Sequence, residues 1–318
     1  MLKLLISRTL PERIEAEARS LYDVTLRRET TPMTEAEVSA ALQSYDAILC
    51  TLGDSFSAAA IKAAGQSPRC RLIANFGVGY NHIATQAAKA AGIAVTNTPG
   101  AVTDATADIG MTLLLMTARR AAEGERLARS GTWTGWQPTQ MLGQHVSGKT
   151  LSIIGMGRIG KAIAKRAHYG FGMEVRFFNR SAVPDPGLPA TQLGTLREAM
   201  RSDFVVIAVP ASPATRHLID ETALAAMPPQ GILINIARGD IIDESALIKA
   251  LQARCIAGAG LDVYEFEPAI PDALRALDNV TLLPHLGTSV LEVREDMGRL
   301  ALQNIADFAA DRPLSTPV

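Results

Sequence analysis

Three side chains that could carry out chemistry each follow an apolar, strand-like run in the second half of the chain. Arg238 stands in INIARGD, Glu267 in LDVYEFEP and His285 in LLPHLGT. Arginine can grip a carboxylate through two parallel hydrogen bonds, and histidine can exchange a proton at a carbonyl oxygen. A glutamate beside the imidazole would orient it and keep it a proton donor near neutral pH. The three residue types together favour proton transfer to a small molecule that carries a carboxylate and a carbonyl group.

Each of these residues also has a simpler interpretation. Arg238 could bind neighbouring backbone carbonyls, Glu267 could be a turn residue before a proline, and His285 could be a packed core histidine. Their occurrence after successive strands favours a shared site, because ligands of an open parallel sheet collect beyond the carboxyl ends of its strands.

The elements that must position these residues are buried strands of one sheet. Short apolar runs of this kind are typical of parallel strands covered on both faces. The runs of the second half are Thr150–Ile154, Glu174–Phe178, 204–209, 231–236, 256–261 and 280–283, with helices such as 245–252 between them.

The first of these runs ends in a glycine-rich turn, Gly155-Met156-Gly157-Arg158-Ile159-Gly160, and a helical pattern follows over 158–169. Strand, glycine turn, helix and strand form the context that a dinucleotide-binding fingerprint requires. The glycines permit a tight turn, the approach of a pyrophosphate and close packing of helix on strand. The helix N-terminus supplies free N–H groups and partial positive charge to the phosphates. This stretch therefore predicts a dinucleotide site.

The residues after the second strand indicate which dinucleotide is bound. Proteins that bind NAD usually carry an acidic residue there, and this chain has Asn179-Arg180-Ser181. No carboxylate repels a 2′-phosphate at this position, and a guanidinium and a hydroxyl can receive it. The sequence predicts NADP as the preferred cofactor, with NAD accepted less well. Alternatively, Arg180 is only a solvated loop charge.

The first half of the chain alternates strands and helices without a phosphate fingerprint. This alternation predicts a second sheet of parallel strands with helices on both faces. The expected strands are 2–7, 24–27, 47–51, 71–75 and 93–97, and the expected helices are 12–21, 34–42, 57–64 and 82–91.

We expect two doubly wound α/β domains. Residues 99–285 would form the nucleotide-binding Rossmann domain, beginning with a long buried helix from Thr103 to about Arg129. A helix over 289–309 would return to the first domain, so that 1–98 and 286–318 form a discontinuous, flavodoxin-like substrate domain. A cleft between two such domains is the default ligand site. Gly131–Gly148, with both tryptophans, could be a subunit-interface arm or a local cap.

Composition excludes several other functions. The chain has 318 residues, 47% of them hydrophobic, with a formal net charge of −1, so no electrostatic footprint for nucleic acid or an anionic membrane exists. No apolar run suits a signal peptide or a membrane span. Cys50, Cys70 and Cys255 lie without metal-ligand spacing and are expected to be reduced core residues of a cytoplasmic protein.

Six motifs in order identify the chain as similar to the D-isomer-specific 2-hydroxyacid dehydrogenases, and within them to the NADPH-dependent glyoxylate/hydroxypyruvate reductases. The resemblance runs almost from end to end of the chain. The motifs are NFGVGYNHI (75–83), VTNTPG (95–100), LSIIGMGRIGKAIA (151–164), NIARGDIID (235–243), GLDVYEFEP (260–268) and LLPHLGTS (282–289).

The resemblance implies a role for each candidate catalytic residue. Arg238 would bind the substrate carboxylate and polarise the carbonyl, and His285 would be the acid/base with Glu267 as its partner. The backbone of Val78 and Gly79 would also receive the carboxylate. Further residues that could frame the substrate pocket are Leu52, Gly53, Phe76 and the partner subunit's Trp136.

The resemblance also implies a cofactor site and a homodimer formed through the nucleotide domain. Asp262, the backbone of Ala237 and His285 would face the nicotinamide, and Thr106 and Arg158 the phosphates. Val209, Pro210 and Thr215 would line the dinucleotide.

Two other functions remain open for a chain of this kind. A 2-ketogluconate-type reductase would use the same chemistry in a roomier pocket. A dinucleotide-sensing, corepressor-like binding protein would share the fold and even the catalytic trio, although such proteins carry additional partner-binding tails.

Overall fold

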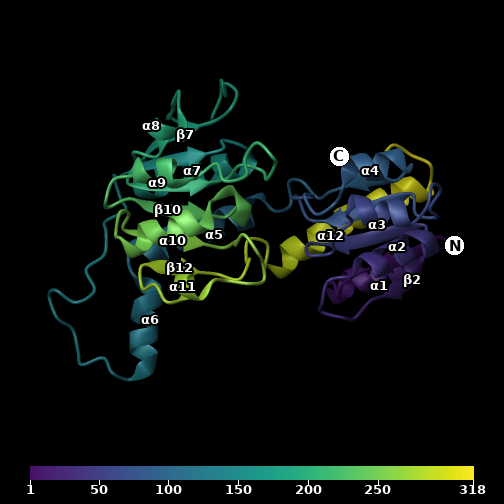
Figure 1. Cartoon of the computed structure of the whole chain (residues 1–318), viewed down its shortest axis with the longest axis horizontal. Coiled ribbons are helices and arrows are strands. Elements are labelled where there is room, and N and C mark those ends of the chain that lie inside the picture. The colour runs from purple at the N-terminus through teal and green to yellow at the C-terminus, as the bar shows by residue number, and fades with distance from the viewer. The chain divides into compact units, whose positions relative to one another are not determined.

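The computed structural model describes all 318 residues, and they form two compact units (Figure 1). Unit 1 comprises Met1–Val102 and Thr288–Val318, and unit 2 comprises Thr103–Gly287. The first unit is therefore discontinuous in sequence. Its limits lie a few residues from the boundaries expected after residues 98 and 285.

Unit 1 is built on a five-stranded sheet with the strand order β2-β1-β3-β4-β5, and every pairing is parallel. This is the doubly wound order in which the chain reverses direction between β1 and β3. The strands are β1 (Lys3–Ile6), β2 (Asp23–Leu26), β3 (Ala47–Thr51), β4 (Leu72–Phe76) and β5 (Ala94–Thr96).

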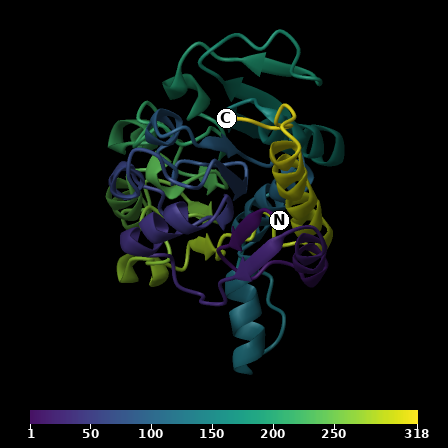
Figure 2. The same cartoon turned by 90° about the vertical axis from the view of Figure 1, so that its right-hand side faces the viewer.

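Helices cover both faces of this sheet because its central strands are apolar on both sides. One group of helices contains α1 (Glu12–Leu21) and α12 (Leu291–Ala309), which pack on each other; α12, yellow in Figure 2, also contacts β4. Gly298 permits the close approach of the pair, since a Cβ there would lie 2.6 Å from Ile14. The other group is α2 (Glu35–Ser44), α3 (Ala58–Ala63) and α4 (Thr85–Ala90).

Unit 2 is built on a seven-stranded, all-parallel sheet with the order β12-β11-β10-β9-β6-β7-β8. Numbered within the unit, its first six strands follow the 3-2-1-4-5-6 order of dinucleotide-binding folds, with the switch point between β6 and β9. The strands are β6 (Thr150–Ile154), β7 (Glu174–Phe178), β8 (Ala190–Gln192), β9 (Phe204–Ile207), β10 (Ile232–Asn235), β11 (Gly258–Leu261) and β12 (Val280–Leu282).

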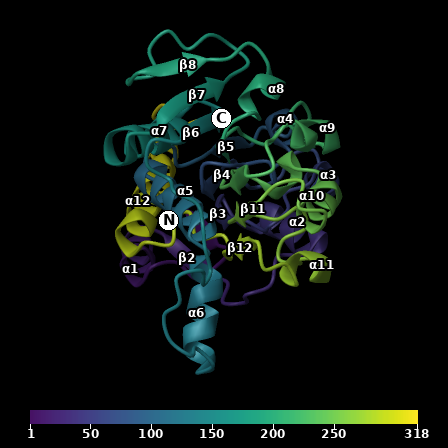
Figure 3. The ribbon, with the colours of Figure 1, turned by 90° about the vertical axis from the view of Figure 1, so that its left-hand side faces the viewer.

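The helices of unit 2 also divide between the two sheet faces. Figure 3 shows α5 (Thr103–Ala118) and α7 (Arg158–Phe171) on one side of the sheet, and α9 (Glu221–Ala225), α10 (Glu244–Gln252) and α11 (Asp272–Arg275) on the other. Each face has its own buried apolar cluster, and neighbouring strand residues alternate between them: Ile153 belongs to the first cluster and Ile154 to the second. The prediction of two doubly wound parallel-sheet domains is confirmed.

The expected helix from Thr103 to Arg129 is wrong, because the structure divides it into α5 and α6 (Ala121–Ser130). Arg120 between them adopts a left-handed backbone, with φ of 53°. The apolar stripe of α5 ends at Ala118, whose carbonyl oxygen accepts a hydrogen bond from the backbone N–H of Gln144. Beyond that point α6 has no buried residue and projects away from the sheet of its unit (Figure 1).

The expectation that all three cysteines are core residues is also wrong. Cys50 and Cys70 are buried, whereas Cys255 is exposed. Cys255 lies in the turn after α10, and burial resumes only at Ile256. No helix of the structure combines the length and the apolar character needed to cross a membrane.

Candidate active site

The predicted catalytic residues of unit 2 follow neighbouring strands at one edge of its sheet. Arg238 comes three residues after β10, Asp262 directly follows β11, and His285 comes three residues after β12. Because these strands are parallel and paired in the order β10-β11-β12, their carboxyl ends lie side by side. Glu267 reaches the same edge on the loop that follows β11.

His285 and Glu267 are in direct contact. The Nδ1 atom of His285 lies 2.8 Å from Oε2 of Glu267, and both side chains remain about one third exposed. Since a carboxylate can only accept, Nδ1–H donates and Nε2 is the nitrogen left for a substrate. His285 has a φ of 56°, and its backbone N–H donates to the carbonyl oxygen of Asp262 at 2.9 Å. His285 is therefore not the packed core histidine of the simpler interpretation.

The carboxylate of Glu267 is held in its charged form. Its burial alone would raise its pKa, but the hydrogen bond and charge of His285, the N–H of Tyr264 at 3.0 Å and the charge of Arg238 outweigh burial, so the pKa lies below its usual value. A charged carboxylate at this place stabilises positive charge on the adjacent imidazole.

Arg238 is fixed by the backbone around it. Asn235 donates its side-chain N–H to the carbonyl oxygen of Arg238 at 2.9 Å and accepts from the N–H of Ala237 at 3.0 Å. The guanidinium donates to the carbonyl oxygen of Ala237 at 2.6 Å, as the simpler interpretation expected. Burial lowers the pKa of Arg238, while the charges of Glu267 and Asp240 oppose this shift. The guanidinium is half-buried, and its planar group of N–H donors is the kind that binds a carboxylate.

Glycine at position 239 brings the Arg238 loop against the Glu267 loop. A Cβ on Gly239 would lie 1.8 Å from the carbonyl carbon of Tyr264 and 2.2 Å from the nitrogen of Glu265. No other residue type fits between these two backbones without displacing one of them. The segments 237–239 and 264–267 therefore pack directly against each other.

Tyr264 also belongs to this cluster, although the sequence did not single it out. Its hydroxyl donates to the carbonyl oxygen of Leu283 at 2.8 Å, two residues before His285, and its backbone N–H binds Glu267. The ring is 5% exposed. Tyr264 therefore couples the loop of Glu267 to the strand end that carries His285. Only its position within GLDVYEFEP could have pointed to it.

Asp262 is buried, with 1% exposure, and accepts the backbone N–H groups of Leu286 at 2.6 Å and Gly287 at 2.9 Å. Burial raises its pKa, against the opposing effect of these hydrogen bonds and of His285. Thr106, at the start of α5, donates its hydroxyl to the carbonyl oxygen of Gly287 at 3.2 Å. Asp262 and Thr106 therefore brace the turn after His285.

The glycine turn after β6 has the shape that a dinucleotide needs. Gly155 has a φ of 101°, and a Cβ there would lie 2.8 Å from the backbone of Ala208; a Cβ on Gly160 would lie 2.2 Å from the carbonyl oxygen of Gly155. Around Gly157, in contrast, nothing lies within 4 Å of the Cβ position. Two glycines thus serve packing and the third leaves open space at the N-terminus of α7, where N–H groups lack intrahelical acceptors.

The residues after β7 are arranged around this turn. Asn179 accepts the backbone N–H of Met156 at 3.3 Å and donates to the carbonyl oxygen of Ser181 at 3.0 Å. Arg180 is exposed and forms no ion pair. The side chain of Asn179 stands where many relatives of this fold have an acidic residue that binds the ribose. Its amide has a similar shape to a carboxylate but carries no charge. On the far side of the switch point, Val209 and Pro210 follow β9, and the hydroxyl of Thr215 donates to the carbonyl oxygen of Pro210 at 2.8 Å.

In unit 1, the loop of Val78 and Gly79 presents free N–H groups. The side chain of buried Asn75 donates to the carbonyl oxygens of Gly77 at 2.9 Å and Gly79 at 3.0 Å, and Asn97 donates to that of Val78 at 2.8 Å. The carbonyl groups are thus occupied, whereas the N–H groups of Val78 and Gly79 donate to no protein acceptor. This pattern suits an anion such as a carboxylate.

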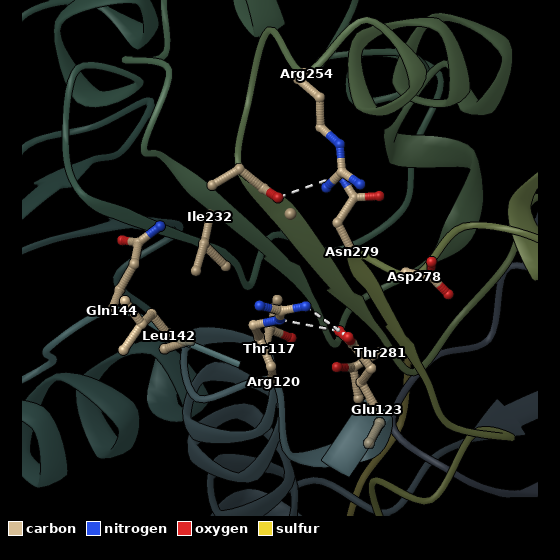
Figure 4. A pocket seen from close by; sticks show the side chains of 15 residues that line it. Thr117, Arg120, Glu123, Leu142, Gln144, Ile232, Arg254, Asp278, Asn279 and Thr281 are labelled. Carbon is tan, nitrogen blue, oxygen red and sulfur yellow. Dashed lines mark hydrogen bonds and ion pairs between the residues drawn. The ribbon is translucent and has the colours of Figure 1, made fainter. Parts of the chain in front are cut away.

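The remaining candidates differ in exposure. Leu52 and Gly53 follow β3 and are exposed, whereas Phe76 at the end of β4 is 4% exposed and packs in the core. Trp136 lies in the irregular segment after α6 with 79% exposure. Unit 2 also has a cavity of about 440 Å³ at the amino ends of β10, β11 and β12, where Arg120 and Glu123 form an ion pair (Figure 4). None of the predicted site residues lines it.

The sheet of unit 2 has a glycine turn at its switch point, and an acid–base pair and an arginine lie at the carboxyl ends of its strands. These features are typical of an oxidoreductase that uses a nicotinamide dinucleotide. Residues 111–287 match the family model of the D-isomer specific 2-hydroxyacid dehydrogenase, NAD binding domain. The chain belongs to this family of D-isomer specific 2-hydroxyacid dehydrogenases, and its cofactor is a nicotinamide dinucleotide.

Several relatives are similar over nearly their whole length. A glyoxylate reductase from Thermococcus kodakarensis is 41% identical, over 96% of this chain and 92% of the relative. A glycerate dehydrogenase from Hyphomicrobium methylovorum is 38% identical, over 94% and 93%. A solved structure of an NADPH-dependent glyoxylate/hydroxypyruvate reductase from Sinorhizobium meliloti, in complex with NADP and malonate, has a TM-score of 0.89 and 32% identity, with coverage of 100% and 96%.

Proposed function

We propose that this protein is a reductase that uses NADPH to convert small 2-keto acids, such as glyoxylate and hydroxypyruvate, into D-2-hydroxy acids. The contact of His285 with Glu267 beside Arg238 carries the proposal, because it combines a proton donor with a carboxylate receptor at the edge of a dinucleotide-binding sheet. The similarity to glyoxylate reductases supports this substrate class.

The residues of the chain have separate tasks in this reaction. Arg238 binds the substrate carboxylate and polarises the neighbouring carbonyl. In unit 1, the N–H groups of Val78 and Gly79 are proposed as carboxylate donors on the strength of the family resemblance. His285 gives the proton on Nε2 to the carbonyl oxygen, and Glu267 stabilises the imidazolium beforehand. The reduced nicotinamide, when bound, supplies the hydride that the carbonyl carbon accepts.

The preference for NADPH rests on the residues after β7. Asn179, Arg180 and Ser181 offer a neutral amide, an unpaired guanidinium and a hydroxyl to a 2′-phosphate, and no carboxylate of their own repels it. The dinucleotide pyrophosphate is expected at Gly157, Arg158 and the start of α7. Asp262 and the Ala237 backbone are expected to hold the nicotinamide carboxamide.

We also infer a homodimer formed through unit 2. The helix α6 has no buried residue, and the segment after it exposes Trp133 by 55%, Trp136 by 79% and Leu142 by 67%. Large apolar side chains gathered on one projecting segment are typical of an interaction surface. Sedimentation of the wild type and of W136A tests this inference; a monomeric wild type would contradict it.

The proposed function is tested by initial rates with NADPH and with NADH against glyoxylate, hydroxypyruvate, 2-ketogluconate and pyruvate. We expect fast NADPH oxidation with the two small acids named first. A preference for 2-ketogluconate would instead identify the roomier reductase with the same mechanism. Tight NADPH binding without turnover of any of these acids would contradict the small-acid substrates and point to another keto acid or to the dinucleotide sensor.

A further inference from the structure

Unit 2 contains a second histidine–carboxylate pair beside the proposed catalytic one. The Nε2 atom of His217 lies 2.8 Å from Oε1 of Glu265, and Glu265 stands only two residues before Glu267. Neither residue has a part in the reaction described above.

His217 connects the two loops that carry the proposed site. Its backbone N–H donates to the carbonyl oxygen of Asp240 at 2.8 Å, two residues after Arg238, while its ring binds Glu265 on the other loop. Its φ is 50°, in the left-handed region, where histidine, asparagine and aspartate are the commonest residues after glycine. This backbone conformation lies at the point where both bonds are made.

Glu265 is held from two further directions. Its backbone N–H donates to Oε1 of buried Glu244 in α10 at 3.1 Å, and its Oε1 also contacts Arg216 at 3.1 Å. The peptide between Tyr264 and Glu265 is the one that touches Gly239. The side chain of Glu265 is 9% exposed, whereas that of Arg216 is 56% exposed. The side chain of His217 is 32% exposed, so it is the more enclosed of the two partners of Glu265.

We propose that His217 is a positioning residue. Through its two hydrogen bonds it holds the loop of Arg238 and the loop of Glu267 at a fixed separation. This inference rests on the proposed function of Arg238 and Glu267. Because the loops carry the carboxylate receptor and the partner of the proton donor, an error in their separation affects both substrate binding and turnover.

The substitution H217N tests the proposal. Asparagine tolerates a left-handed backbone and retains the N–H that binds Asp240, but its side chain is too short to take the place of the ring. We expect kcat/KM for glyoxylate with NADPH to fall by about tenfold to a hundredfold, with a rise in KM as well as a fall in kcat. H217Q, which restores a donor at greater reach, should recover part of the loss.

Two further variants separate positioning from general damage. R216A removes the exposed partner of the same Glu265 oxygen and should leave kcat/KM within about twofold of wild type. E265A should resemble H217N, because each removes the contact between the ring and the carboxylate, and the double variant should be no worse than either single one. A loss of folded protein lowers the apparent kcat without changing KM, so the KM of the folded variant is the deciding measurement.

Wild-type KM and kcat in H217N would overturn the proposal, as would additive losses in the double variant. H285N is measured in the same assay. A fully active H285N would show that the proposed function itself is wrong, whatever H217N does. An inactive H285N together with an unchanged H217N would reject only the positioning role.

Discussion

The imidazole of His285 and the carboxylate of Glu267 meet at 2.8 Å although the residues follow different strands of the sheet. The contact depends on three local features. Asp262 holds the turn after His285, Tyr264 binds both the strand end before His285 and the Glu267 carboxylate, and Gly239 lets the Arg238 loop pack against the same segment. The site is therefore a product of loop packing at adjacent strand ends.

The lowered pKa of Glu267 makes the stability of the protein depend on pH at this site. A carboxylate with a lower pKa in the folded state stabilises the fold above the ordinary glutamate pKa, and this contribution is lost as pH falls through the lowered pKa. We expect E267Q to have a lower Tm than wild type at neutral pH and the difference to shrink in acid. Thermal unfolding measured across this range, with exposed Glu12→Gln as control, checks it. A difference that stays constant with pH would contradict the expectation.

Substitution of Gly239 should damage both fold and activity. In G239A the new methyl group would lie 1.8 Å from the carbonyl carbon of Tyr264, which is a severe steric clash. One of the two loops must therefore move. We expect a loss of about 3 kcal/mol or more of unfolding free energy and a strong loss of turnover. The control is G170A in α7, where nothing lies within 4 Å of the Cβ position; there we expect no loss of stability. Equal Tm values for the two variants would refute the packing argument.

Cofactor preference should depend on Arg180. Removal of the guanidinium in R180A takes away one charge-assisted contact to a 2′-phosphate, which corresponds to a rise of about tenfold in the KM for NADPH. The KM for NADH should not change, because NADH has no 2′-phosphate. Steady-state kinetics with both cofactors measures this difference. A parallel rise for both would assign Arg180 to another part of the dinucleotide.

The carboxylate receptor in unit 1 should depend on Asn75. In N75A the carbonyl groups of Gly77 and Gly79 lose their donors, and the loop loses the conformation that presents the N–H groups of Val78 and Gly79. We expect the KM for glyoxylate to rise by about tenfold. N97A removes one bond from the same loop and should have the smaller effect. An unchanged KM in N75A would show that this loop does not receive the substrate.

The strand pattern and the glycine turn were predictable because they depend on local features of the sequence. Buried parallel strands read as apolar runs, and the glycine spacing around Gly155 reflects backbone contacts that only glycine allows. The break of the helix at Arg120 was not predictable, since both flanking segments have good helical sequences and the chain at Gln144 binds the end of α5. The strand β8 and the helices α8 (Leu196–Ala199), α9 and α11 are too short to show a period.

The residues of the candidate site were predictable, and so was the pairing of His285 with Glu267, but the contacts that hold these residues in place were not. The positions of Arg238, Glu267 and His285 after strands indicated a common edge, and the motifs suggested their roles. The partners that hold them were hidden, because Tyr264 and Glu265 look like ordinary loop residues and His217 lies far away in sequence. Their function follows only from hydrogen bonds between loops.

The central claim is that His285 transfers the proton to the keto acid while Arg238 holds the carboxylate. The most direct measurement compares NADPH oxidation by wild type and H285N at saturating glyoxylate, with NADPH affinity measured by fluorescence titration. We expect kcat to fall by about a hundredfold or more while the protein still binds NADPH. A variant that keeps the wild-type kcat would show that His285 does not transfer the proton.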